Sequence, residues 1–233
     1  PTLEEEKAIG EMLSWLNREL TLPHEIIVAD GRSTDKTVEI ARLFGSKVLT
    51  TSQEHPSPAR QRNDGGRAAS GEYIIFLDCG VSFPNPDAFF TRAISAFESD
   101  PLLLGLTGPQ RALPSIETWA DRVGFGLLSV GVRIKNNFFS IGEASGKFMM
   151  LRKSTFEAVH GLRDDLITRE DADFFWRISQ IGKTRFDPKL MVYHAARRAH
   201  RIGWVRLWWT WFVNTVWVTL FNKSLSKEWT PVR

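Results

Sequence analysis

Aspartates follow two short apolar runs of the sequence, at the points where strands of a sheet would end. Residues 25–29 precede Asp30, and residues 73–77 precede Asp78. The carboxylate of Asp30 could accept a hydrogen bond from the imide of a nucleobase, or it could only cap the helix that follows. An ionised Asp78 needs a metal ion or a hydrogen-bond donor, unless it is a structural turn residue. Both positions are therefore candidates for a ligand site.

A second acidic pair, Glu170 and Asp171, opens a segment with helical spacing. The helix dipole favours acidic residues in the first turn of any helix, so the pair has a purely structural explanation. A carboxylate held in a cleft can instead serve as a general base, a role worth about 10²–10⁴ in rate. Both explanations stay open at this point.

Cationic side chains follow these acids. His194 ends a predicted strand and could bind a divalent metal ion, or it could simply be packed or exposed. Arg197, Arg198 and Arg201 have the chemistry to hold phosphate or pyrophosphate oxygens. The alternative for these arginines is a solvated basic loop.

Strands and helices that alternate through the first hundred residues would position the two aspartates. The patterns predict these elements in turn: strands at 25–29, 47–50 and 73–77, with helices at 37–44 and 61–69. Such alternation is typical of a mostly parallel sheet with helices on both faces, which binds ligands at the carboxyl ends of its strands. Asp30 and Asp78 would lie at those ends.

The two ends of the domain are predicted from other signals. Thr2 and Glu5 have the spacing of a capping box, which predicts a first helix that Pro23 closes. Residues 102–150 mix short apolar runs with glycines and show no clear order. The remaining elements predicted are helices at 154–160 and 171–180 and a strand at 185–194 that Pro188 interrupts. We expect one α/β domain followed by a helical tail.

The composition limits the class of protein. The 233 residues are 42% hydrophobic and 24% charged, which is ordinary for a globular enzyme and excludes a disordered, collagen-like or coiled-coil chain. A single cysteine, Cys79, excludes internal disulfides and suits a reducing compartment. From Lys183 onward ten Lys and Arg face two acids, while the preceding residues carry a net charge of −5. This asymmetry indicates a membrane surface or a phosphate-bearing partner and makes nucleic acid a poor candidate.

The tail at 201–233 is basic and rich in tryptophan. Its apolar stretch at 203–221 would be roughly 28 Å long as a helix, just enough to cross a bilayer. Its tryptophans are typical of a membrane interface, and Arg206 and Asn214 disfavour a spanning helix. We expect an interfacial helix or the start of a membrane segment, with Lys223 and Lys227 near lipid headgroups. The alternative is a helix that packs on the domain.

Taken in order, these motifs resemble the family 2 glycosyltransferases of the GT-A fold, from residue 1 to about 194. Residues 25–37, EIIVADGRSTDKT, are similar to the family's strand and Asp-Gly-Gly-Ser-Thr-Asp turn. The other segments that match by type and spacing are Pro1–Glu5, Arg62–Gly65, Ala69–Glu72, Tyr73–Asp78, Gly146–Arg152 and Glu170–Asp171. The resemblance implies a nucleotide-binding half at 1–100 and an acceptor half at 101–200.

The resemblance also implies roles for the residues that bind the donor. Asp30 would recognise the base of a nucleotide sugar, with a UDP-sugar favoured, and Thr2 and Glu5 would line the same pocket. Arg62 and Asn63 would lie near the nucleotide or hold the loop that covers it.

By the same resemblance, Asp171 would deprotonate the acceptor hydroxyl for in-line attack, and Glu170 would support it. Asp78 would reach the ribose or a divalent ion, Mg²⁺ or Mn²⁺, bound to the diphosphate. The family's acidic motif is Asp-x-Asp, but here Gly80 replaces its second aspartate. The diphosphate and water would then supply most of the ligands, with His194 as a further one.

The family's first strand would precede Pro1. We therefore expect a gap in the sheet beside the strand that ends at Asp30, with unpaired strand edges. The function implied is inverting transfer of a sugar to an acceptor hydroxyl, in a lipid-linked or polysaccharide acceptor, at the cytoplasmic face of a membrane. A sugar nucleotidyltransferase is disfavoured because no Gly-rich triphosphate loop is present. A non-catalytic domain that binds a nucleotide or scaffolds a membrane complex is the remaining alternative.

Overall fold

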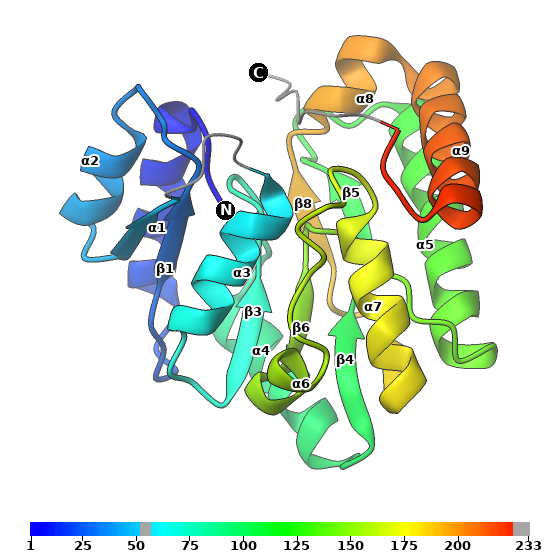
Figure 1. The fold of residues 1–233 in the computed structure, drawn as a ribbon. Helices are drawn as coiled ribbons and strands as arrows, with labels where there is room; N and C mark the ends of the chain where they lie inside the picture. Colours follow the sequence, from blue (N-terminus) through cyan, green and yellow to red (C-terminus); the bar gives the residue numbers. More distant parts are fainter. Residues whose placement is uncertain (52–56, 226–233) are drawn as a thin grey trace.

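The computed structural model of the chain describes residues 1–51 and 57–225. Its helices are α1 (Glu6–Glu19), α2 (Thr37–Leu43), α3 (Pro58–Ala68), α4 (Pro86–Glu98), α5 (Trp119–Phe138), α6 (Lys153–Ala158), α7 (Glu170–Ile181), α8 (Arg197–Ile202) and α9 (Trp204–Phe221). Its strands are β1 (Ile27–Asp30), β2 (Lys47–Thr50), β3 (Tyr73–Phe76), β4 (Leu103–Thr107), β5 (Gln110–Ala112), β6 (Met149–Arg152), β7 (Lys183–Phe186) and β8 (Val192–His194). Figure 1 shows this α/β arrangement.

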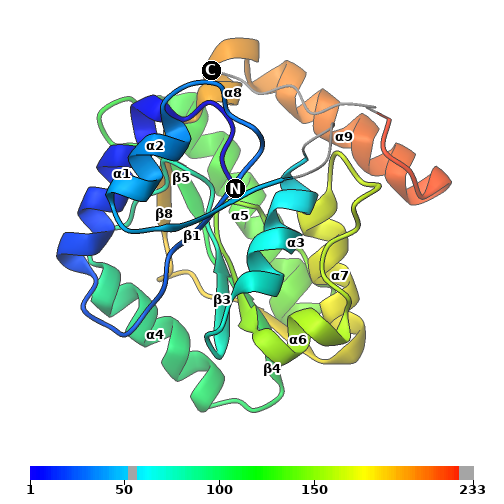
Figure 2. The ribbon, with the colours of Figure 1, turned by 60° about the vertical axis from the view of Figure 1, so that its left-hand side comes forward.

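The central sheet has four strands in the order β3-β6-β4-β7, and helices cover both of its faces. Figure 2 shows β3 between α4 on one side and α3, α6 and α7 on the other. Strands β4 and β7 are parallel, whereas β6 runs antiparallel to both of its neighbours. Two parallel pairs, β1 with β2 and β5 with β8, flank this sheet. The predicted fold class is confirmed, with β6 as the antiparallel element.

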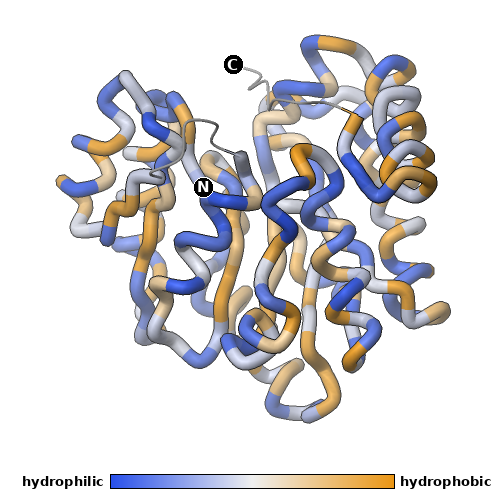
Figure 3. The backbone as a smooth tube through the Cα atoms, viewed as in Figure 1, coloured by the Kyte–Doolittle hydropathy of each residue, from blue (hydrophilic) through white to orange (hydrophobic). Residues whose placement is uncertain are grey.

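Strand β6 separates two hydrophobic cores because its successive side chains point to opposite faces. Met150 packs with Phe97 and Leu106 in the core beneath α4. Met149 packs with Phe174 in the core beneath α6 and α7. Strand β6 is among the hydrophobic segments of the chain trace in Figure 3. Burial on both faces explains why Met149, Met150 and Leu151 of β6 form a continuous apolar run.

The predicted gap beside β1 is present. Among the described strands, β2 is the one that pairs with β1, and β1 forms no ladder with β3. A cavity of about 420 Å³ lies between them, lined mainly by apolar side chains of α1, β1 and β3. Thr2 continues the pairing at one edge of this cavity, since its N–H donates to Ala29 O over 2.9 Å. That a strand precedes Pro1 stays a prediction.

The capping box predicted at Thr2 and Glu5 is wrong. Helix α1 begins at Glu6, and the side chain of its N-cap residue, Glu5, forms no capping hydrogen bond. The hydroxyl of Thr2 donates to Asp30 Oδ1 instead, over 3.2 Å. The turn after β1 supplies the cap, because Asp35 Oδ2 accepts from the N–H of Glu6 over 3.1 Å.

The second half of the chain differs from the sequence prediction in two places. Residues 102–150 contain the long helix α5, which begins with a capping box formed by Thr118 and Asp121. The single strand expected over 185–194 is two strands, β7 and β8, which belong to different sheets. Pro188 lies between them, where it cannot donate to a ladder.

Helix α9 docks on the domain along one side only. Asn214 is buried, and the hydroxyl of Thr168 donates to its Oδ1 over 3.2 Å. Two further contacts hold the loop before α7: Ser224 Oγ accepts from the N–H of Ile167 over 2.8 Å, and Arg169 Nη1 donates to Thr215 Oγ1 over 2.7 Å. The alternative of a helix packed on the domain is thus correct for this side of α9.

The tail prediction is tested in part. In the stretches covered by the structure, no helix, α9 included, is both long enough and apolar enough to cross a bilayer. Lys227 lies outside the described residues. The division of the chain at residues 100 and 200 stays a prediction.

Candidate active site

Strand register brings Asp78 and Lys147 to the same edge of the central sheet. Phe76 pairs with Met149 across the antiparallel ladder of β3 and β6, so Asp78 follows this pair on one strand and Lys147 precedes it on the other. Lys147 Nζ donates to Asp78 Oδ2 over 2.7 Å. Parallel β1 ends on the same side with Asp30, as Figure 1 shows.

Arg62 connects this edge to the start of α7. Its side chain is 3% exposed, and it projects from α3, which Ser57 caps and Pro58 begins. Nη2 donates to Asp78 Oδ1 over 2.7 Å, and Nη1 donates to Glu170 Oε1 over 2.9 Å. A guanidinium suits this position because its fork can serve two carboxylates at once. Arg62, Asp78, Lys147 and Glu170 therefore form one charged network.

The backbone at Gly146 fixes the other carboxylate, Asp171. Its Oδ2 accepts from the N–H of Gly146 and its Oδ1 from the N–H of Ala172, each over 2.8 Å. A Cβ at Gly146 would lie 2.2 Å from Arg62 Nη2, so only glycine fits between the Arg62 guanidinium and the Asp171 carboxylate. The Gly146–Lys147 segment thus contacts both the Asp78 side and the Asp171 side of the site.

Burial and neighbouring charges shift the pKa values of these acids in different directions. Burial, together with the charge of Asp171, raises the pKa of Glu170 from 4.5 to about 7. Burial also raises the pKa of Asp171. Burial would raise the pKa of Asp78 as well, but Lys147 and Arg62 outweigh it and hold this pKa well below its usual range. The site therefore combines a permanently charged carboxylate with a pair that can take up a proton near neutral pH.

Asp30 is buried in the turn that follows β1. The N–H of Ser33 donates to its Oδ2 over 2.9 Å, and the hydroxyl of Ser33 donates to Oδ1 over 2.6 Å. Arg32 has φ of 69°, the left-handed conformation that the family's usual glycine adopts without cost. Asp30 does not cap α2, because Asp35 Oδ1 accepts from the N–H of Thr37 there. The base-recognition role of Asp30 stays a prediction.

Asn63 holds a loop. Its Nδ2 donates to Leu162 O over 2.8 Å and to Asp164 Oδ1 over 2.6 Å, and its Oδ1 accepts from the N–H of Leu162. Whether this loop covers a nucleotide, as the second of the two roles implied for Asn63 requires, stays a prediction. Asn63 connects α3 to the segment that leads into α7 and the Glu170–Asp171 pair.

Glu5 pairs with the first arginine of the predicted cluster. Arg197 Nη2 donates to Glu5 Oε2 over 2.9 Å, and Nη1 donates to Oε1 over 3.1 Å. The same Nη2 lies 3.6 Å from where a Cβ at Gly80 would be. Arg197 and Arg198 are half-buried in the short helix α8 and are not part of a solvated loop, whereas Arg201 is exposed.

His194 ends β8, and its two ring nitrogens have different surroundings. Nδ1 accepts from the N–H of Ala196 over 3.0 Å, while Nε2 is buried without a hydrogen-bond partner. Burial, aided by the charge of Lys147, lowers the pKa of His194 to about 3, so the ring is neutral. A neutral ring whose Nδ1 accepts a hydrogen bond carries its proton on Nε2.

The donor set does not fit a resident divalent ion. Within residues 1–51 and 57–225, no three His, Cys, Asp or Glu side chains gather around a point that could hold a metal. Each oxygen of Asp78 already faces a cation. A histidine that binds a metal through Nε2 carries its proton on Nδ1 and donates it to a carbonyl or carboxylate, but His194 Nδ1 faces an N–H group.

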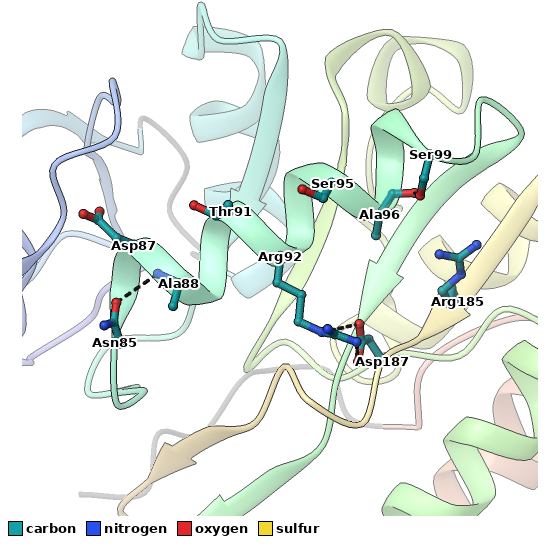
Figure 4. Close-up of a pocket in the computed structure, with 10 residues that line it drawn as sticks. All are labelled: Asn85, Asp87, Ala88, Thr91, Arg92, Ser95, Ala96, Ser99, Arg185 and Asp187. Carbon is teal, nitrogen blue, oxygen red and sulfur yellow. Dashed lines mark hydrogen bonds and ion pairs between the residues drawn. The ribbon is translucent and has the colours of Figure 1, made fainter.

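A separate hollow lies elsewhere, on the outer face of α4. Its volume is about 710 Å³, and Arg92 and Asp187 form an ion pair of 2.8 Å at its wall (Figure 4). None of the site residues predicted from the sequence lines it. The chemistry of the chain is therefore concentrated at the sheet edge and not in this hollow.

The arrangement of this mixed sheet and its helices is similar to that of solved glycosyltransferases, and the protein has their GT-A fold. The structure is similar over 97% of the chain to a mannosyltransferase from Pyrobaculum calidifontis in complex with GDP-Man and Mn²⁺, with a TM-score of 0.71, 16% identity and 64% of that chain covered. It is also similar to S. aureus TarS 1–349, with a TM-score of 0.64 at 16% identity, over 97% of this chain and 65% of that one.

Residues 1–159 match the family described as Glycosyl transferase family 2, and the chain belongs to this family. It is 26% identical over 218 residues to the succinoglycan biosynthesis protein ExoA of Rhizobium meliloti (strain 1021), covering 88% of this chain and 64% of that protein. It is 24% identical over 181 residues to the O-antigen chain rhamnosyltransferase WbaN of Salmonella anatum, covering 74% of this chain and 56% of that protein. The chain thus spans less than two thirds of these relatives' lengths.

Lys147 is the site residue that the sequence reasoning missed. The Gly146–Arg152 segment resembles the family, but the resemblance assigns no role to this lysine. The signal available was a positive residue directly after a glycine and before an apolar strand, in a chain whose acidic motif lacks its second carboxylate.

Proposed function

We propose that the protein is an inverting glycosyltransferase that transfers a sugar from a nucleotide-diphospho-sugar to an acceptor hydroxyl. One observation carries the proposal. Asp171, a half-buried carboxylate with a raised pKa, is fixed by two backbone N–H groups beside the cationic edge formed by Arg62 and Lys147. A base for the acceptor and positive charge for the leaving diphosphate would then act at one site.

In this mechanism Asp171 takes the proton from the acceptor hydroxyl as the oxygen attacks the anomeric carbon from the face opposite the leaving group. Glu170 is held by Arg62, and its pKa is raised by burial and by the charge of Asp171 beside it. Arg62 and the half-buried Arg197 and Arg198 supply positive charge toward the diphosphate.

The donor would bind with its base near Asp30, where Thr2 and Glu5 line the pocket, and with Asn63 holding the adjoining loop. Solved structures similar to this one are described as complexes with GDP-Man, UDP-Glc and UDP-GlcNAc. We favour a UDP-sugar. Relatives whose names refer to O-antigen, succinoglycan and poly(ribitol-phosphate) support an acceptor in cell-envelope glycan synthesis, either lipid-linked or polysaccharide.

We further propose that the enzyme works at the cytoplasmic face of a membrane, with α9 and α5 in contact with the lipid. The support is the set of large apolar side chains that both helices leave exposed: Trp119, Val123, Leu127, Val130, Ile134 and Phe138 on α5, and Val205, Trp208, Trp209, Phe212, Val216, Trp217 and Leu220 on α9. Exposed Arg206 and Lys223 beside them suit anionic headgroups.

Binding to anionic liposomes tests the membrane surface. Replacing Trp208 and Trp209 by serine is expected to remove binding, while Trp176→Ser, an exposed tryptophan of α7, leaves it intact. Equal binding by both variants would exclude α9 as the lipid contact.

A divalent ion is the expectation from the family, and four of the similar structures are described as holding Mn²⁺. Asp78 and His194 are the residues that would hold it here. The donor set described above does not fit such an ion, so no step of this mechanism is assigned to a metal.

The test of catalysis compares Asp171→Asn with Asp173→Asn in the same helical turn. Asp173 pairs with Arg177 over 2.8 Å and serves as the matched control. We expect Asp171→Asn to lose about 10²–10⁴ in the rate of nucleoside diphosphate release and to keep donor binding.

Donor binding is read from thermal shifts with UDP, GDP and their sugars. A ligand at a hundred times its Kd adds about 2.7 kcal/mol to the unfolding free energy. This corresponds to several degrees at roughly 2–4 °C per kcal/mol. Donor binding without turnover in the unmodified protein would favour the non-catalytic alternative.

A further inference from the structure

Asp78 is neutralised from both sides by side chains. Lys147 Nζ and Arg62 Nη2 each lie 2.7 Å from one of its oxygens. A metal ion bound at Asp78 would have to displace the ammonium or share a carboxylate with it. Gly80, at the position of the family's second aspartate, brings no carboxylate to compensate.

The charge at this point already suits a diphosphate. A divalent ion held by two carboxylates leaves no net charge. Lys147 and Arg62 face the carboxylates of Asp78 and Glu170, so these four groups carry no net charge when Glu170 is ionised and about +1 when it is protonated. Lys147 is about a third exposed, so it is open to a ligand, while Arg62 is buried behind it. The ammonium has three N–H groups, of which Asp78 uses one.

His194 supplies a second, independent observation at the same place. Its Nε2 is buried without a partner, and the charges of both Lys147 and Asp78 act on the ring. Because Nδ1 accepts a hydrogen bond, Nε2 carries the proton and is a donor. A buried N–H donor without a partner can be satisfied by an anionic oxygen but not by a metal ion.

We propose that Lys147 takes the place of the divalent ion, so that sugar transfer by this enzyme needs no metal. The inference rests on the function proposed above. The bond between the anomeric carbon and the β-phosphate oxygen breaks, and its electron pair stays on the diphosphate. The acceptor oxygen forms the new bond, and its proton passes to Asp171. Lys147 and the Nε2–H of His194 donate hydrogen bonds to the diphosphate oxygens and are otherwise unchanged.

The experiment measures the affinity for UDP and GDP by titration calorimetry, and nucleoside diphosphate release from their sugars, in EDTA and in Mn²⁺. The unmodified protein is expected to bind one nucleoside diphosphate and turn over in EDTA, with less than about a threefold change on adding Mn²⁺. Lys147→Met is expected to weaken binding roughly ten- to a hundredfold in EDTA, the size of a hydrogen bond to a charged group. Lys147→Arg keeps the charge and is expected to stay within about tenfold.

Lys153→Met is the matched control, because its Nζ donates to the backbone carbonyl of Ala69 over 2.7 Å and contacts none of the charged network. Binding and turnover by the unmodified protein only with Mn²⁺ would overturn the inference and leave the proposed function standing. Equal affinities of Lys147→Met and Lys153→Met would also overturn it. Failure of every nucleotide and nucleotide sugar to bind, with or without Mn²⁺, would overturn the proposed function and the inference together.

Discussion

Replacing Arg62 by glutamine would test whether the charged network holds the site together. The guanidinium is buried between Asp78 and Glu170, with Asp171 close enough to raise its pKa. Removing one partner of a buried ion pair costs about 3–5 kcal/mol, because the remaining charge is left uncompensated. At roughly 2–4 °C per kcal/mol, a loss of ~3 kcal/mol lowers Tm by roughly 6–12 °C.

Urea denaturation at pH 8 and pH 5 measures this loss. The expected loss is smaller at pH 5, since Glu170 can then take up a proton and no longer needs the guanidinium. Arg67→Gln is the control on the same helix: Arg67 is 60% exposed, and it lies 3.5 Å from Asp64. Its loss should be below about 1 kcal/mol at both pH values. A loss for Arg62→Gln as small as that of the control would refute the reasoning.

Three further predictions concern single positions. Because the pKa of Glu170 is raised from 4.5 to about 7, its contribution to stability is fully present below pH 4.5 and is lost as the pH rises through 7. The unfolding free energy of Glu170→Gln relative to the unmodified protein should therefore rise over that range in urea titrations. Gly146→Ala should lower the unfolding free energy by about 1–3 kcal/mol in urea melts, because the new Cβ would collide with Arg62. Gly126→Ala is the control: a Cβ there meets open space in α5, and the change should raise the unfolding free energy by ~0.5–1 kcal/mol. Burial would raise the pKa of Asp121, but its hydrogen bonds outweigh burial and lower this pKa to about 2. The carboxylate anchors α8 through His200 and α9 through Trp204. Asp121→Asn should therefore lower the unfolding free energy by about 2–3 kcal/mol at pH 7 and by less near pH 2 in the same assay.

The first half of the fold could be predicted from the sequence because its signals are local. Strand β3 is a continuous apolar run that ends in a turn, and β1 precedes a turn full of capping residues. Helix α5 could not be predicted in this way, since Gly124 and Gly131 interrupt its sequence and many of its apolar residues face outward. The capping box at Thr2 failed for another reason: pairing with Ala29 and Asp30 gave the Thr2 backbone and hydroxyl better partners.

The candidate site could be predicted at the level of residue types but not of contacts. Asp78 and Asp171 were found because acids at strand and helix ends are visible in the sequence. The position of Lys147 opposite Asp78 depends on the register of β3 and β6, which are more than seventy residues apart. The protonation of His194 depends on one backbone N–H, that of Ala196, which no sequence pattern reports.

The contacts between α9 and the loop before α7 set an order on the synthesis of the chain. Ser224 lies 57 residues after Ile167, and its Oγ accepts a hydrogen bond from the N–H of Ile167. At 5–20 residues per second, a ribosome needs roughly 3–11 s to make that stretch. Strands β7 and β8 are made within this interval, and throughout it the loop leading to Glu170 lacks its contact with Ser224. The loop that precedes the proposed base therefore gains these contacts only after the tryptophan-rich helix has emerged.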